Sequence, residues 1–135
     1  MAEIVGLTGQ IAQGCLFAQQ FLDDAKTAPE DLRKLKTEVE LVGTTVRSTE
    51  KIIWQAQELG VEVDNNEYDA ALQHCVDVVQ SLGNTLEKQC KVFATDHKWW
   101  ERMKVPAREK LLDEEIQKLE STKMQLHMVQ INVSL

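Results

Sequence analysis

The chain has 135 residues, of which 43% are apolar and 27% are charged, and its formal net charge is −7. This length suits a single domain, and the composition excludes collagen-like, low-complexity and wholly disordered proteins. The acidic balance argues against a nucleic-acid-binding protein, because phosphate binding requires clustered positive charge. No run of 18 apolar residues occurs, which argues against a constitutive membrane span.

The first predicted helix covers residues 2–26, and Pro29 marks the start of the next one. Its apolar residues recur at intervals of three and four, as expected for one buried face. This stripe consists of Ile4, Leu7, Ile11, Cys15, Ala18 and Leu22, and it is widened by Val5, Leu16, Phe17 and Phe21.

The second and third predicted helices cover residues 29–59 and 65–95, each with an apolar seam of the same period. Gly60 suits the C-cap of the second helix. Asp64 and Glu67 have the spacing of a capping box, in which Asp64 caps the third helix and Glu67 reaches back.

A short helical junction around Trp99 and Trp100 precedes the last predicted helix, residues 106–133, where Pro106 suits the first turn. Four amphipathic helices with short connections predict an all-α fold, an up-down four-helix bundle in one domain of residues 1–135. Because residues 129–135 still follow the helical pattern and show no stop signal, we expect that the chain was cut from a longer protein or continues into another segment.

Nothing in the sequence predicts an enzyme, since no P-loop, nucleophile elbow, zinc-protease or dinucleotide-binding motif occurs. His74 and Cys75 are adjacent, but neighbouring helical residues point about 100° apart and do not face one another. The cysteines, Cys15, Cys75 and Cys90, are odd in number and form no Cys-x-x-Cys pair. We therefore expect no metal and no cofactor, a reducing compartment, and buried thiols.

The first predicted helix is unusual because the 19 residues from Ile4 to Leu22 carry no charge. As a helix they would extend about 28 Å, close to the ~30 Å of a bilayer's hydrocarbon core. Four glutamines make this stretch too polar for a resting membrane span. Three glycines, Gly6, Gly9 and Gly14, also destabilise a water-exposed helix by about 1 kcal/mol each relative to alanine. Either the helix also functions in lipid, or the glycines allow close packing in the bundle.

Positive charge gathers near the tryptophans, where residues 85–110 hold seven basic and four acidic side chains. Aromatic residues mixed with lysine and arginine are typical of lipid headgroup interfaces. The candidate interface residues are Lys98, Trp99, Trp100, Arg102 and Lys104. In the alternative interpretation, one tryptophan fills the end of the bundle core and the basic side chains are solvated.

Two patterns resemble a known family over essentially the whole chain. The first is the opening segment Ala2-Glu3-Ile4-Val5-Gly6-Leu7-Thr8-Gly9. The second is the closing pattern Trp100, Lys104, Leu111, Leu112, Ile116, Leu119, Lys123 and Leu126. Both resemble the HeLo-like N-terminal domains of fungal STAND receptors, NOD-like proteins that carry a NACHT nucleotide-binding domain downstream.

The resemblance implies a cell-death effector of heterokaryon incompatibility or innate-type responses, cytoplasmic until it is recruited to the plasma membrane. Its implied mechanism is homo-oligomerisation, release of the N-terminal helix and insertion of residues 4–22 into the membrane. The inserting side chains would be Ile4, Leu7, Ile11, Leu16, Phe17 and Phe21. Alternatively, the chain is a soluble adaptor that self-associates or docks a partner without acting on membranes.

Overall fold

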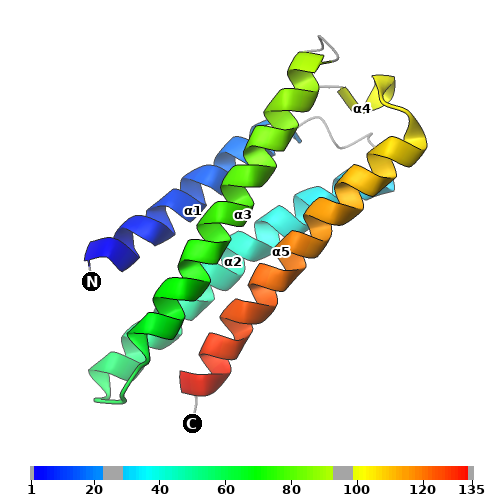
Figure 1. Ribbon diagram of the computed structural model, residues 1–135. Coiled ribbons are helices and arrows are strands. Elements are labelled where there is room, and N and C mark those ends of the chain that lie inside the picture. The colour runs from blue at the N-terminus through cyan, green and yellow to red at the C-terminus, as the bar shows by residue number, and fades with distance from the viewer. Residues whose placement is uncertain (1, 23–28, 93–98, 134–135) are drawn as a thin grey trace.

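The computed structural model describes residues 2–22, 29–92 and 99–133. These residues form four long helices and one short helix, with no strand among them (Figure 1). The helices are α1 (Ala2–Gln20), α2 (Glu30–Glu58), α3 (Asn65–Val92), α4 (Trp99–Arg102) and α5 (Val105–Val133). The all-α four-helix bundle predicted from the sequence is therefore confirmed, with the short helical junction directly before the last helix.

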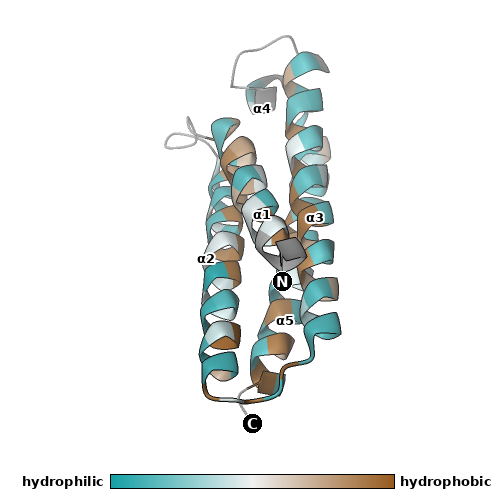
Figure 2. Cartoon of the chain, turned by 90° about the vertical axis from the view of Figure 1, so that its left-hand side faces the viewer, coloured by the Kyte–Doolittle hydropathy of each residue, from teal (hydrophilic) through white to brown (hydrophobic). Residues whose placement is uncertain are grey.

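The long helices alternate in direction along the chain, so α1 and α3 run one way and α2 and α5 run the other (Figure 1). The most extensive contacts join α2 to α5 and α1 to α3, and both pairs are parallel. Smaller contacts join α3 to α5 and α1 to α2. Consequently α2 and α3 lie on opposite sides of the bundle, although a short turn connects them (Figure 2).

That turn forms as its cap residues predict. Gly60 adopts a positive φ of 75°, which costs glycine little because it has no Cβ. The Val61 N–H donates to the Ala56 carbonyl at 2.9 Å and the Gly60 N–H to the Gln57 carbonyl at 3.1 Å, a Schellman motif. Gly60 therefore ends α2 and sets the direction of the chain towards α3.

The cap of α3 is only half of the predicted capping box. The Asp64 carboxylate accepts the backbone N–H groups of Asn66 and Glu67, both at 3.1 Å. The Glu67 carboxylate instead accepts a hydrogen bond from Asn132 Nδ2 of α5 at 2.7 Å. The Glu67 side chain, which the local pattern predicts to bond back to the cap, thus bonds to Asn132 of α5 instead.

The first helix was predicted to extend to residue 26, but α1 ends at Gln20, and residues 21 and 22 form a turn. The rest of the predicted extension, residues 23–26, lies outside the described residues. The Phe21 N–H donates to the Ala18 carbonyl at 3.1 Å and the Leu22 N–H to the Gln19 carbonyl at 2.9 Å. These hydrogen bonds join residues three apart, the 3₁₀ pattern that tightens a helix end. Leu22 is nevertheless buried and continues the apolar stripe. Residues 23–28 and 93–98 lie outside the described residues.

The core is built from the predicted apolar stripes of all four long helices. It includes the three cysteines, which are free and buried as expected. Burial raises the pKa of the Cys75 thiol to about 12 and that of the Cys15 thiol to about 11, because desolvation disfavours the thiolate. At neutral pH both side chains therefore pack as small apolar groups.

Candidate functional site

The uncharged helix α1 is the candidate effector element, and its predicted inserting residues divide between two faces. Leu7 and Ile11 are buried in the bundle, while Leu16 is 63% exposed. Phe17 is 36% exposed, and half-buried Phe21 packs against the core. The side chain of Ile4 lies outside the described residues. No single face of α1 thus presents the predicted inserting set to solvent.

Two reciprocal glycine contacts hold α1 against α3. A Cβ atom at Gly14 of α1 would stand 2.5 Å from Val79 Cγ1 of α3. A Cβ atom at Gly83 of α3 would stand 2.7 Å from Phe17 Cδ2 of α1. In each helix a glycine therefore leaves room for a side chain of the other helix. Close packing thus accounts for the presence of a glycine at position 14.

The other two glycines of α1 have a different environment. A Cβ atom at Gly6 or Gly9 would meet no other atom within 4 Å. The packing interpretation from the sequence therefore applies to Gly14 alone. Gly6 and Gly9 are exposed and leave space beside the helix.

The seam between α1 and α2 is open, whereas the seam between α1 and α3 is tightly packed. A groove of about 610 Å³ runs along it. Buried Ile11, Cys15, Val39 and Val46 form its floor, and Gly9 on α1 lies in its wall. The ribbon of α1 crosses the bundle at an angle in Figure 2, and α1 contacts α3 more extensively than it contacts α2. α1 is thus seated chiefly on α3.

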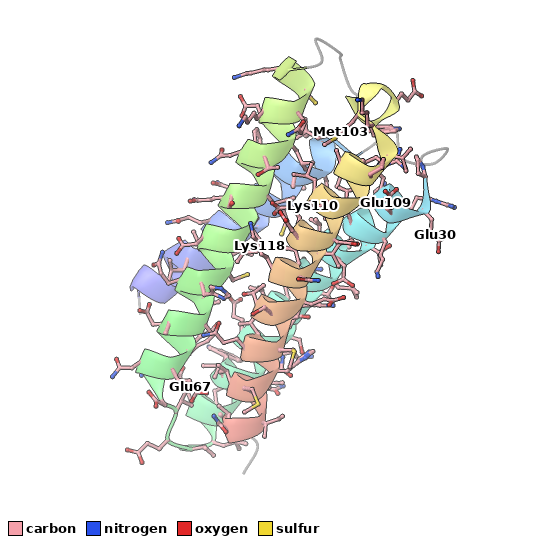
Figure 3. All side chains as sticks on the ribbon, turned by 45° about the vertical axis from the view of Figure 1, so that its right-hand side comes forward. Glu30, Glu67, Met103, Glu109, Lys110 and Lys118 are labelled. Carbon is pink, nitrogen blue, oxygen red and sulfur yellow. The ribbon has the colours of Figure 1, made fainter. Side chains whose placement is uncertain are left out.

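By contrast, polar side chains tie α5 to both of its neighbours. Asp31 and Glu38 of α2 pair with Arg108 and Lys123 of α5 at 3.0 and 2.8 Å. The Gln130 amide donates to the Thr49 hydroxyl at 2.8 Å. At the far end Asn132 reaches Glu67 of α3, which Figure 3 labels near the start of that helix. α1 has no charged side chain between residues 4 and 20 with which to form an ion pair.

The basic junction does not lie on the surface as one unit. Trp100 is 3% exposed and belongs to the core. Met103 packs against the same core at the end of the bundle near α4 (Figure 3). The alternative interpretation, that one tryptophan fills the core end, describes Trp100 in this structure. Lys104 is exposed. Lys98 and the side chains of Trp99 and Arg102 lie outside the described residues.

The outer face of α5 carries an apolar stripe that was not predicted from the sequence. Met124, Met128 and Ile131 are all more than half exposed. Their spacing of four and three residues places them on one side of the helix. The spacing of these residues is visible in the sequence, but periodicity alone does not distinguish an exposed apolar stripe from the margin of a buried seam.

Among the described residues, no helix is both long and apolar enough to cross a membrane. No group of three or more His, Cys, Asp or Glu side chains in that part of the chain could hold a metal ion. No protein family, curated protein or solved structure matches the chain.

Proposed function

We propose that this chain is the N-terminal effector domain of a fungal NOD-like receptor acting in regulated cell death, and that α1 leaves the bundle to insert into the plasma membrane. One observation carries the structural part of this proposal. The interhelical ion pairs of the described residues join α2 to α5, whereas α1 is seated by apolar contacts. The resemblance to HeLo-like domains supports the biological part.

The energetics link release of α1 to an apolar destination. Moving α1 and the turn that follows it into water would expose Leu7, Ile11 and Leu22, which are now buried, at about 1.5–3 kcal/mol each. A bilayer would accept the same side chains without that cost. A membrane therefore lowers the free-energy cost of releasing α1 relative to release into water.

The glutamines of α1 support a homo-oligomer at the membrane. Gln10, Gln13 and Gln20 are exposed on α1 in the bundle. In hydrocarbon their amides would need hydrogen-bonding partners, which neighbouring copies of α1 can supply. Lys98, Arg102 and Lys104 would then meet lipid headgroups, and a NACHT-type domain would follow downstream in the full-length receptor.

The test is dye release from vesicles of anionic phospholipid, comparing the unmodified chain with Leu16→Glu. Leu16 is exposed in the bundle, so the charge leaves folding intact. At the centre of an inserted helix, an acidic residue costs about 3 kcal/mol. We expect Leu16→Glu to abolish leakage.

The matched control is Leu41→Glu, which places the same charge on another exposed leucine, in α2. This variant should release dye like the unmodified chain. Equal leakage from the Leu16→Glu protein, with its helical circular dichroism unchanged, would refute insertion of α1.

The apolar stripe of Met124, Met128 and Ile131 favours a second candidate function, a helical adaptor that docks a partner or another copy without membrane activity. This candidate predicts no dye release. It also predicts that Met128→Glu lowers the mass of any complex observed by light scattering, with the fold retained.

A further inference from the structure

The groove between α1 and α2 has the form of a binding site for a chain-like apolar ligand. Its floor is apolar, formed by side chains from both helices. Its walls are low because Gly9 of α1 and Gly43 of α2 carry no side chain. A Cβ atom at Gly9 would meet nothing within 4 Å, so the groove is unoccupied by neighbouring side chains at this point.

A cationic group lies over this floor. Arg47 of α2 lines the groove, and its Nη1 atom lies 3.8 Å from the Cβ position of Gly43. Its Nη2 donates to the Thr44 hydroxyl at 3.4 Å. The positive charge of Arg47 also acts on the buried Cys15 thiol, partly offsetting the effect of burial on its pKa. Among the ion pairs of the described residues, none includes Arg47.

From this combination we infer that the groove binds a single-chain anionic amphiphile, a fatty acid, with its tail along Ile11, Cys15 and Val39 and its carboxylate at Arg47. An apolar tail buries its surface on the groove floor. A guanidinium pairs with a carboxylate through two parallel hydrogen bonds. This inference concerns the folded bundle and does not depend on the proposed release of α1.

Two carboxylates also line the groove, and they limit where the head of the ligand can lie. Glu40 and Glu50 flank Arg47 on α2, and both are exposed. Water and salt weaken the repulsion from exposed charges. This weakened repulsion permits a carboxylate at Arg47. It still disfavours positions of the fatty acid carboxylate nearer to Glu40 or Glu50.

The test titrates the full chain with dodecanoate below its micelle concentration, followed by calorimetry and by the melting temperature. Because the ligand contacts α1 and α2 together in the folded state, saturable binding should raise the melting temperature. Gly9→Leu should fill the groove and weaken binding about tenfold or more. Arg47→Gln should weaken it by a similar factor, because a charge-assisted hydrogen bond is lost.

Each variant has a matched control outside the groove. Gly6→Leu adds the same side chain at the neighbouring open glycine of α1, and Arg33→Gln removes a charge from α2 away from the groove lining. Both controls should bind dodecanoate like the unmodified chain, and dodecanol should bind more weakly than dodecanoate. Absence of saturable binding, or equal affinity in Gly9→Leu, would overturn the site. Equal affinity in Arg47→Gln would overturn the anionic ligand.

Discussion

The aromatic ring of Phe17 lies against Gly83, so close that a Cβ atom at position 83 would stand 2.7 Å from Phe17 Cδ2. Phe17 also packs edge-on against Phe21, with ring centroids 5.2 Å apart. The reverse contact, Val79 against Gly14, lies one turn away along the same seam. Together these contacts fix the register of α1 on α3.

Gly14→Ala should destabilise the bundle, whereas Gly6→Ala should stabilise it. The added methyl at position 14 meets Val79, which is buried and β-branched and so has little freedom to move. Overpacking of this kind costs about 1–3 kcal/mol, more than the gain in helix propensity. At position 6 the space is open, and alanine gains about 1 kcal/mol. Urea unfolding measures both, and equal shifts would contradict the packing.

Lys123→Ala should be strongly destabilising, on the order of 3 kcal/mol, because it leaves the Glu38 carboxylate without its partner in a mostly buried site. The control is Lys91→Ala, which removes an exposed pair with Glu87 at nearly the same N–O distance, 3.0 Å. That change should cost less than about 0.5 kcal/mol. Similar unfolding midpoints for the two variants would show that burial of Glu38 carries no energetic weight.

Gly60→Ala should destabilise the turn between α2 and α3 by about 1 kcal/mol. Its φ of 75° places a Cβ atom in the left-handed region, where alanine is strained. Differential scanning calorimetry should therefore detect a lower melting temperature. An unchanged melting temperature would mean that the turn can relax to a negative φ without loss of its two backbone hydrogen bonds.

Stability should fall as the pH rises above about 9. Burial raises the pKa of Cys75 from its ordinary 9.0 to about 12 and that of Cys15 to about 11. Above pH 9 the unfolded chain loses these protons while the folded bundle keeps them, so deprotonation favours unfolding. The urea midpoint should decrease from about pH 8 to about pH 10, and less so in Cys75→Ala. Rapid labelling of both thiols by an aromatic disulfide in native buffer would contradict their burial.

Local sequence features determined which residues form helices and which faces are buried. The period of apolar residues predicted all four long helices, and the two turn residues Gly60 and Asp64 predicted the boundaries between α2 and α3. The free energy of a cap or of an amphipathic face depends on neighbours within a few residues, so it can be read without the fold. The end of α1 was missed because the buried stripe continues through Leu22 after the helix has ended.

Only the tertiary structure decided which helix meets which face. Periodicity shows that a face is buried, but the apolar side chains that could cover it are alike on every helix. Hence the packing of α1 on α3, the opposite placement of α2 and α3, and the side chain that occupies each glycine could not be derived from the sequence. The same reason applies to Trp100. The aromatic and basic residues around it fit either a lipid interface or the end of the bundle core, and its burial depends on the space left at that end.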